Sequence, residues 1–471
     1  MAGYRWRLPL LASPIRAVND DIEAIAADLE IAPSRSGATP SEPVHVPRTR
    51  SVAVVGLGYV GLPLAAAYLR AGLRTVGVDH DPALVDTLRA GRTPHPHLDP
   101  ESWRVGQPGG LEPVTDLARV AECDAVSLCL PTPADADGRP ELEPLRRAAS
   151  ALAEVLVAGQ LVLLHSTVYP GFTRDELIPL LESGGLRVGR DLFVAYSPER
   201  EDPGRGLGTH AVARLVGGAC EVARERAVDL LESAVERVHP TVDIETAEAA
   251  KLHENVYRAV NIALVTELAE VYRKLGLDPH AVVDAAATKP YGFEAFRPGP
   301  GPGGHCIPVD PRYLLWAAER VEATSPLLER SLEVNAAEPS RWVNRAIDTL
   351  EGLGRSVEGA EVLVLGLAYK AGVGDLRESP GLAIASGLLE RGCRVLFADP
   401  HIDPLSPEVR LLRDLGEGLA GPVSAEPGAL SRALERADLA LLLVDHPEFD
   451  LRALKGSRAP ILDPRGVLRG G

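Results

Sequence analysis

The amino-acid sequence predicts an α/β protein in which two Rossmann-like, doubly wound lobes are joined by a long central helix and a helical middle domain. Strand, turn and helix patterns alternate from residue 51 and again from about residue 360, and a long helical pattern separates the two regions. Such alternation is typical of parallel sheets whose crossover helices cover both faces. The 471 residues are enough for about three domains.

Composition and charge argue against several classes of protein. Lysine and arginine total 49 against 66 aspartate and glutamate, and the net charge of −17 argues against binding to nucleic acid or to an anionic membrane. The five cysteines are scattered, without a CxxC pair or zinc-like Cys/His spacing, so neither a disulfide framework nor a metal site is predicted. The apolar stretches are too short to span a bilayer or to form a convincing signal sequence. We therefore expect a reduced, cytoplasmic protein.

Residues 1–50 are predicted to form an extension before the first lobe. Apolar residues within 15–30 recur at helical spacing, and a stretch rich in proline, serine and glycine follows and predicts a linker. A helix of this kind can cover a neighbouring surface or a second subunit.

The first lobe, predicted over residues 51–245, opens with an apolar strand at 51–55 and the glycine-rich turn GLGYVG. A helix and a second strand that ends in Asp79 follow the turn. Further strands are predicted at 124–130 and 160–166, each after a helical segment. This order predicts a parallel, doubly wound sheet.

The glycine-rich turn fits the pattern G-x-G-x-x-G between a strand and a helix. The first glycine permits the tight turn, the second lets backbone N–H groups approach a pyrophosphate, and the third allows close helix–strand packing. A carboxylate at the end of the next strand bonds the ribose 2′-OH and repels a 2′-phosphate, which favours NAD over NADP. The alternative is a Rossmann-like lobe that has lost its ligand. The predicted NAD-binding residues of this fingerprint are Gly56, Gly58, Tyr59, Val60, Gly61 and Asp79.

A long helix is predicted over residues 246–275, which lack proline and contain no glycine. Its many apolar residues indicate a buried spine within a middle domain, residues 246–340. Lys251 and Asn255 are four residues apart and so share one face of the helix. An ammonium and an amide that face a cleft can stabilise an oxyanion or position a hydroxyl. The alternative is a lysine that extends along the surface, with an asparagine nearby.

The same domain contains PGPGPGGHCIPVDP, residues 298–311, in which Cys306 is surrounded by turn-forming residues. Glycines let the backbone pass close to a ligand, and prolines stiffen the loop. Asp310, four residues later, can act as a general base or hold a water. Beside a dinucleotide site, a thiol can trap an aldehyde as a thiohemiacetal, which a second oxidation converts to a thioester. The alternative is an inert loop cysteine.

The second lobe is predicted over residues 341–471. Its strands are expected within 359–370, 393–400 and 437–445, with a helix at about 379–391 between the first two. Because this lobe lacks G-x-G-x-x-G, it is the weaker candidate for a dinucleotide.

These features occur together and in this order in one family. The chain resembles the nucleotide-sugar 6-dehydrogenases, which include the UDP-glucose, UDP-N-acetylglucosamine and UDP-N-acetylmannosamine dehydrogenases. The resemblance covers roughly residues 50–450, and seven motifs in order are far more specific than any one of them. The motifs are GLGYVGLPLA, LPTP, HSTVYPG, SPER, KLHENVYRAVNIAL, PGPGPGGHCIPVDPRYL and GLAYKAGVGDLRESP.

The resemblance implies a role for each matching residue. Cys306 would be the nucleophile of the second oxidation, and Lys251 and Asn255 would stabilise oxyanion character at the reacting carbon. The water that deprotonates the alcohol and later cleaves the thioester would be held or activated by Thr167, Asp310 and Glu199. NAD would also contact Thr132, Pro133, Ser166 and Arg377. The nucleotide sugar would be held by Arg200, Arg297, Gly301, Gly303, Tyr369 and Lys370.

The resemblance also implies the reaction and the assembly. The reaction would be a four-electron oxidation of a sugar CH₂OH to a carboxylate, giving an NDP-hexuronate and consuming two NAD and one water. The nucleotide would lie on the C-terminal lobe, and the long helix would form the interface of a homodimer. Two positions depart from the family: Leu84 stands where many relatives have Lys or Arg, and Arg297 stands where the N-acetylglucosamine branch usually has Tyr.

The sugar stays open at this point, because UDP- or TDP-glucose and a UDP-N-acetylhexosamine all fit the motifs. SPEREDPG, TKPYGF and GGHCIPVDP most resemble the N-acetylglucosamine branch, whereas a composition rich in alanine, arginine and glycine points weakly to TDP-sugars. Two other functions share parts of the pattern. A two-electron β-hydroxyacid-type dehydrogenase has the same lobe, helix and Lys/Asn pair but needs no thiol, and an inactive NAD-binding scaffold needs none of the catalytic set.

Overall fold

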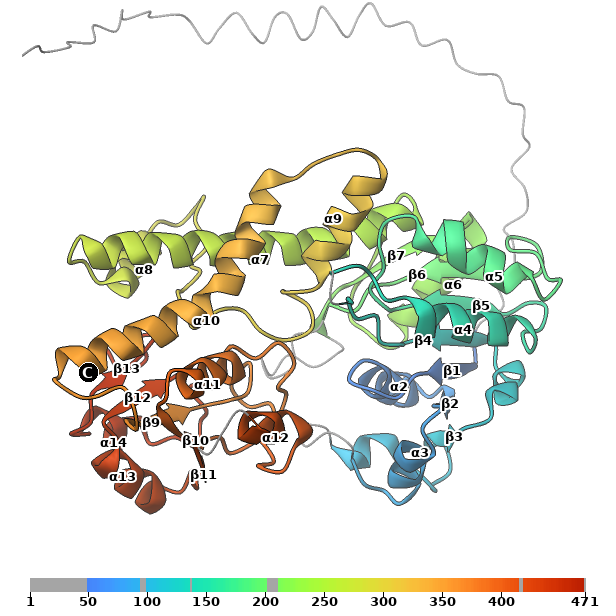
Figure 1. Cartoon of the computed structure of the whole chain (residues 1–471). Helices are drawn as coiled ribbons and strands as arrows, with labels where there is room; N and C mark the ends of the chain where they lie inside the picture. Colours follow the sequence, from blue (N-terminus) through green and yellow to red (C-terminus); the bar gives the residue numbers. More distant parts are fainter. Residues whose placement is uncertain (1–48, 94–98, 136–137, 201–210, 415–417, 470–471) are drawn as a thin grey trace, which may run out of the picture. The chain divides into compact units, whose positions relative to one another are not determined.

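The structure confirms the predicted fold class: helix α7 (Ile244–Lys274) joins two sheets of Rossmann-like parallel strands (Figure 1). The helix predicted within residues 15–30 lies outside the part of the chain that is described. Among the described residues, no helix is both long and apolar enough to cross a membrane. The computed structural model describes residues 49–93, 99–135, 138–200, 211–414 and 418–469.

The first sheet contains eight strands in the order β3-β2-β1-β4-β5-β6-β7-β8. Neighbouring strands are parallel except β6 and β7, which are antiparallel and so need no crossover helix between them. Strands such as β5, LVLL, are apolar and buried throughout because helices cover both faces of the sheet. The strands are β1 (Ser51–Val55), β2 (Arg74–Val78), β3 (Glu112–Val114), β4 (Ala125–Leu128), β5 (Leu161–Leu164), β6 (Phe193–Tyr196), β7 (Arg214–Gly218) and β8 (Val238–Pro240).

The helices of this lobe follow the strands they connect. Asp81 caps α3 by accepting a hydrogen bond from the backbone N–H of Ala83, and a proline occupies the first turn, which is a common helix start. The helical elements are α2 (Gly61–Arg70), α3 (Pro82–Arg89), α4 (Glu143–Ala153), α5 (Ile178–Glu182) and α6 (Glu221–Glu232), the 3₁₀ turns Pro100–Trp103 and Leu117–Glu122, and the π-helical turn Thr173–Leu177.

The second sheet contains five parallel strands in the order β11-β10-β9-β12-β13. Its strands are β9 (Glu361–Leu365), β10 (Arg394–Ala398), β11 (Leu419–Pro422), β12 (Leu439–Leu442) and β13 (Ile461–Leu462). Its helices are α11 (Pro380–Glu390), α12 (Pro407–Asp414), α13 (Pro427–Arg436) and α14 (Leu451–Lys455).

The first five strands of the first sheet and all five of the second have the same topology, and the two lobes repeat one turn. Gly56 and Gly366 both have positive φ, of 93° and 89°, and each donates its N–H to the last residue of the neighbouring strand at 2.8 Å. The next residue in each turn donates its N–H to an aspartate that follows this strand, Asp79 in the first lobe and Asp399 in the second, again at 2.8 Å.

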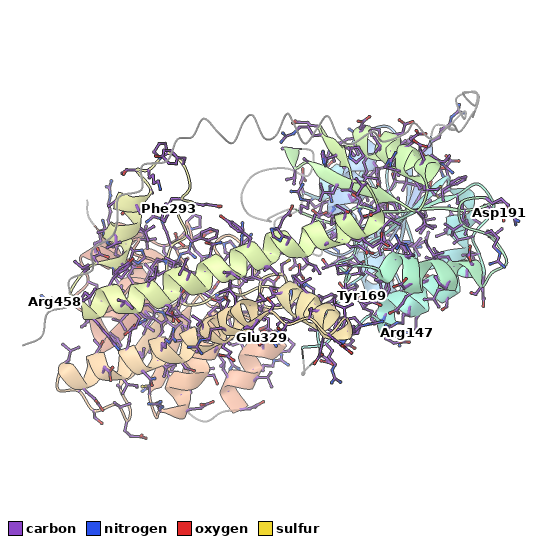
Figure 2. The ribbon with its side chains drawn as sticks, turned by 90° about the horizontal axis from the view of Figure 1, so that it is seen from above. Arg147, Tyr169, Asp191, Phe293, Glu329 and Arg458 are labelled. Atoms are coloured by element: carbon purple, nitrogen blue, oxygen red, sulfur yellow. The ribbon has the colours of Figure 1, made fainter. Side chains whose placement is uncertain are left out.

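Two long helices form the middle region. Asp243 caps α7 by accepting a hydrogen bond from the N–H of Thr246, and α10 lies alongside α7 (Figure 2). Pro339 lies inside α10, so the carbonyl of Asn335 lacks the usual N–H partner four residues on. The helices of this region are α7 (Ile244–Lys274), α8 (Pro279–Ala286), α9 (Asp310–Arg320) and α10 (Pro326–Gly352).

The loop before α9 packs tightly against the second lobe. A Cβ atom on Gly303 would lie 2.7 Å from the carbonyl oxygen of Glu378 and 2.8 Å from the Cβ of Tyr369. The adjacent Gly304, at φ 81°, faces the ring of Tyr369 and donates its N–H to the carbonyl of Arg377 at 2.9 Å. Glycine is therefore required here by the contact between two protein segments.

We expect Gly303→Ala to lower the free energy of unfolding by about 1–3 kcal/mol, because neither a carbonyl nor a Cβ atom can rotate away from the added methyl group. Chemical denaturation measures this loss. Gly299→Ala is the matched control, since its Cβ would meet no atom within 4 Å, and it should change stability by less than about 0.5 kcal/mol. Equal losses in the two variants would show that the packing argument is wrong.

Candidate functional site

Cys306 lies at the turn that leads into α9. Its carbonyl oxygen accepts hydrogen bonds from the N–H groups of Val309 and Asp310, at 3.3 and 2.8 Å. The chain therefore makes one helical turn between the thiol and the carboxyl group of Asp310. The Cys306 side chain is exposed to solvent, so a substrate can reach it.

Four charged groups act on the Cys306 thiol. Burial among the surrounding protein atoms raises its pKa, although solvent reaches the side chain, and the negative charges of Asp310 and Glu199 raise it further. The positive charges of Lys251 and Arg377 oppose this shift. The structure thus brings together the predicted nucleophile and four other predicted site residues. Without substrate, the thiol stays protonated at neutral pH.

The Asp310 carboxyl group is buried and is held by two residues of α7. Its Oδ2 atom accepts a hydrogen bond from Asn255 Nδ2 at 2.5 Å, and Lys251 Nζ lies 3.9 Å from the same oxygen. Burial raises the pKa of Asp310 to about 6, against the opposing effects of Lys251 and Asn255. A carboxyl group with this pKa is a carboxylate at neutral pH and can accept a proton readily.

Glu199 is fixed as an acceptor by two neighbours. The fully buried Arg214 donates from Nη1 to Glu199 Oε2 at 2.7 Å, and the backbone N–H of Arg200 donates to Oε1 at 2.7 Å. The Arg200 side chain does not bond to Glu199 but forms an ion pair with Glu254 of α7, in which Nε and Nη2 donate to the two carboxylate oxygens at 3.1 and 2.5 Å. The sequence did not indicate Arg214, because nothing in the local pattern pairs it with SPER.

Thr167 lies in a loop that Glu248 anchors to α7. The half-buried Thr167 follows β5, and farther along the loop the N–H groups of Gly171 and Thr173 donate to Glu248 at 2.6 and 3.0 Å. The fully buried Glu248 precedes Lys251 by three residues on α7, and burial raises its pKa to about 7. Glu248 therefore links the Thr167 loop to the helix that carries Lys251. In the sequence, the one hint that Glu248 is buried is that this carboxylate stands among apolar residues of the predicted helix.

The glycine-rich turn fits a bound dinucleotide. A Cβ on Gly56 or Gly61 would collide with backbone atoms, whereas one on Gly58 would meet no atom within 4 Å, which leaves open space beside the start of α2. No side chain caps α2, so its first N–H groups can face a pyrophosphate. Asp79 accepts hydrogen bonds from the N–H groups of Leu57 and Asp81. Its Oδ1 atom also lies 3.3 Å from His80 Nδ1, and its Oδ2 atom keeps a further acceptor position for a ribose hydroxyl.

The remaining NAD-side residues are held by hydrogen bonds from other segments. Tyr313 of α9 donates its hydroxyl hydrogen to the carbonyls of Thr132 and Pro133, at 2.7 and 3.1 Å. Ser166 Oγ accepts a hydrogen bond from the N–H of Leu130 at 2.9 Å. These bonds place the loops after β4 and β5 beside each other, at the carboxyl ends of neighbouring strands where α/β sheets bind ligands.

Arg377 reaches from the second lobe to the glycine-rich turn. Its guanidinium lies 5.1 Å from the centre of the Tyr59 ring, and it forms an ion pair of 2.6 Å with Asp375. Close by in the sequence, Lys370 Nζ lies 5.8 Å from the centre of the Tyr369 ring. Residues predicted to bind NAD and nucleotide sugar therefore come from both lobes.

Arg297 and Gly301 belong to the loop that leads to Cys306 but have other neighbours. Arg297 Nη2 lies 2.6 Å from Asp284 Oδ1 of α8, and both side chains are half exposed. Gly301, at φ 116°, lies against α10, where a Cβ would be 3.5 Å from Pro339 and 3.6 Å from the Asn335 carbonyl. The structure does not place Arg297 among the groups that surround Cys306.

Sequence models of the UDP-glucose/GDP-mannose dehydrogenase family match the chain in three parts. The NAD binding domain matches residues 50–235, the central domain 245–337 and the UDP binding domain 363–470. The chain belongs to this family. It is therefore an NAD-dependent oxidoreductase that acts on nucleotide sugars at C6, as the resemblance of its motifs implied.

Curated relatives and solved structures agree with this membership. The chain is 35% identical over 355 residues to the UDP-N-acetyl-D-glucosamine 6-dehydrogenase of Pseudomonas aeruginosa, covering 74% of this chain and 83% of that one. It is 33% identical over 432 residues to the NDP-N-acetyl-D-galactosaminuronic acid dehydrogenase of Ralstonia solanacearum, covering 89% and 96%. The solved UDP-D-ManNAc dehydrogenase from Pyrococcus horikoshii has a TM-score of 0.77 at 30% identity, covering 89% of this chain and 96% of that one.

We expect kcat/KM of this dehydrogenase to fall as pH drops through about 6, because protonated Asp310 cannot accept a proton. Asp310→Asn should lower kcat/KM by about 10²–10⁴-fold and abolish this acid limb, as pH profiles of NADH formation would show. The exposed Asp348 of α10 is the control, and Asp348→Asn should keep both rate and profile. An unchanged acid limb in Asp310→Asn would assign it to another group.

Proposed function

We propose that this dehydrogenase oxidises the C6 hydroxymethyl group of an NDP-hexose to a carboxylate through a thioester on Cys306. The observation that carries the proposal is the group formed by the exposed thiol, the buried Asp310 one turn later, and the Lys251 and Asn255 side chains that contact Asp310. A two-electron dehydrogenase has no use for the thiol in this group.

In the first oxidation, a base removes the hydroxyl proton while hydride leaves C6, which gives the aldehyde. The ionised Asp310, with a water held by Thr167 and Glu199, is suited to take that proton at neutral pH. Lys251 and Asn255 stabilise the negative charge that develops on oxygen. NAD, when bound, accepts the hydride in each oxidation.

In the second oxidation, Cys306 Sγ bonds to the aldehyde carbon and its proton moves to the carbonyl oxygen, which gives a thiohemiacetal. Loss of the hydroxyl proton to the base and of a second hydride from C6 leaves a thioester. Water then adds to the thioester carbonyl, the C–S bond breaks and the thiol recovers its proton. The sum is one alcohol and one water converted to one carboxylate, with two hydrides transferred and three protons released.

Each of the three regions takes one part of this reaction in our proposal. Residues 51–245 bind NAD, 246–340 supply the cysteine loop and the Lys/Asn pair, and 341–471 bind the nucleotide. We further propose a UDP-N-acetylhexosamine as the substrate, because several related curated proteins are named for sugars of this class. Arg297, paired with Asp284, replaces a tyrosine that the N-acetylglucosamine branch usually carries and tunes the choice of sugar.

The experiment measures NADH formed per nucleotide sugar for UDP-glucose, TDP-glucose, UDP-N-acetylglucosamine and UDP-N-acetylgalactosamine. We expect two NADH per substrate and the highest kcat/KM with an N-acetylhexosamine. One NADH per substrate would indicate a two-electron dehydrogenase, and no turnover with any sugar would indicate a scaffold. Faster oxidation of a glucose nucleotide would overturn the substrate proposal alone.

In the same assay, Cys306→Ser should abolish net formation of uronate and release at most one NADH per substrate, because the serine hydroxyl forms no thioester. Cys220→Ser is the matched control, since Cys220 is a free cysteine at the start of α6, away from the predicted site motifs. Uronate formed by Cys306→Ser at the wild-type rate would refute the covalent step.

We propose that α7 forms the interface of a homodimer. Large apolar side chains are exposed along it at intervals of seven, four, three and four residues, which places them in one stripe; they are Tyr257, Leu264, Leu268, Val271 and Leu275. Contiguous exposed apolar surface of this kind marks a protein–protein contact. The stripe lies on the helix that the resemblance assigns to the interface.

Light scattering coupled to size exclusion should give twice the chain mass of 50.0 kDa for the wild type. The double variant Leu264→Arg/Leu268→Arg should elute as a monomer, because two buried charges per chain oppose association. Leu411→Arg, an exposed leucine on α12, is the control and should leave the mass unchanged. A dimer that persists in the double variant would place the interface elsewhere.

A further inference from the structure

Two histidines and a glutamate converge in the second lobe. His401 follows β10, and His446 and Glu448 follow β12, so the three residues come from the carboxyl ends of two strands that flank β9. One ligand atom from each residue lies within 4.8 Å of the other two. His446 is buried, His401 is mostly buried and Glu448 is exposed, so the cluster opens to solvent on one side.

His446 is oriented as metal-binding histidines are. Its Nε2 atom lies 3.1 Å from Asp399 Oδ2, and both side chains are fully buried. Because the carboxylate accepts the proton of Nε2, the Nδ1 atom keeps a lone pair; its contact is a long hydrogen bond of 3.3 Å from the N–H of Gly372. A carboxylate that fixes the tautomer of a histidine is the usual outer partner of a metal ligand.

The other two groups lie at the spacing a metal requires. His401 Nε2 is a buried atom without a hydrogen bond, and Glu448 Oε1 lies 3.2 Å from it. Two ligands bound tetrahedrally to Zn²⁺ at about 2.0–2.1 Å lie about 3.3 Å apart. Two imidazoles and one carboxylate are a donor set that Zn²⁺ and Co²⁺ prefer, with a fourth position left for water.

We propose that His401, His446 and Glu448 bind one divalent transition-metal ion. Binding requires His446 Nδ1 to exchange its long bond from Gly372 for the metal and to move toward the other two ligands. The ion would tie the loops after β10 and β12 to each other. It would also release the backbone N–H of Gly372, which lies two residues after Lys370 in the segment predicted to hold the nucleotide sugar. The two histidines are 45 residues apart, which explains why no metal-binding spacing is seen in the sequence.

Titration of the untagged full chain, freed of metal by EDTA and dialysis at pH 7.5, tests this site. Isothermal calorimetry with Zn²⁺ and the visible absorption of Co²⁺ should show a stoichiometric site with the spectrum of four-coordinate Co²⁺. His401→Ala and Glu448→Gln should each remove that spectrum or weaken Zn²⁺ binding at least about tenfold. Binding should also be lost at pH 5, where imidazoles are protonated.

His239→Ala, which removes an exposed histidine from β8, is the matched control and should bind as the wild type does. Zn²⁺ should raise the melting temperature of the wild type and of this control, but not of the two cluster variants, because only a bound ligand stabilises the folded state. Absence of a stoichiometric site, or one unchanged in both cluster variants, would overturn the proposal and leave the cluster a packing contact between two histidine rings. Since Glu448 is half exposed, loss of folding cannot explain a result with Glu448→Gln.

Discussion

The buried carboxyl group of Asp310 is the point on which the arrangement of the site depends. It starts α9, while the amide and ammonium groups that face it come from α7, so one contact sets the position of one helix against the other. A buried carboxylate is stable only with such partners, and an incorrect approach of α9 would leave it unpaired. Cys306 precedes α9 by one turn and α9 also ties down the loop after β4 through Tyr313. The position of the thiol relative to the NAD-binding turn therefore follows from this pairing.

The two lobes share a strand order and a glycine turn, yet their aspartates are used differently. In the first lobe, Asp79 keeps acceptor capacity beside the open space at Gly58. In the second, Asp399 is enclosed by two backbone N–H groups of its turn and by His446, and its side chain is fully buried. With these partners, the Asp399 carboxylate is not accessible to a ribose hydroxyl. This is a second structural reason, in addition to the missing glycines, why the second lobe does not bind a dinucleotide in the way of the first. The two lobes thus share a strand order but differ both in the glycines of the turn and in the neighbours of the aspartate.

Local pattern was sufficient for much of the fold. The strand predicted at 51–55 matches β1, and each end of the predicted helix 246–275 is within two residues of the corresponding end of α7. These elements could be predicted because apolar periodicity and helix caps depend on residues close together in the sequence. Helix α10 was not foreseen, since Pro339 usually ends a helix and here packing against α7 overrides it. The sequence did not predict the partners of the site residues. Arg214 contacts Glu199, and Glu248 contacts Thr173, only in the folded chain, and no sequence motif relates the members of either pair. The roles of the predicted site residues rest on motif and proximity together.

The raised pKa of the Cys306 thiol gives the order of events in the proposed reaction. The negative charge of Asp310, the proposed base, raises the pKa of the Cys306 thiol. In the free enzyme it is therefore energetically unfavourable for both groups to be negatively charged. Once Asp310 has taken the proton of the alcohol, its negative charge is gone and the thiol beside Lys251 ionises more readily. Asp310 must then pass this proton to solvent before it can accept the hydroxyl proton of the thiohemiacetal in the second oxidation. The first oxidation therefore prepares the nucleophile for the aldehyde it has just produced. A thiol that stays protonated until then is also protected from oxidation, since the thiolate is the reactive form. The closeness of Asp310 and Cys306 would be a disadvantage if both groups had to be negatively charged at the same time. It is no disadvantage when the alcohol is oxidised first and the thiol reacts afterwards.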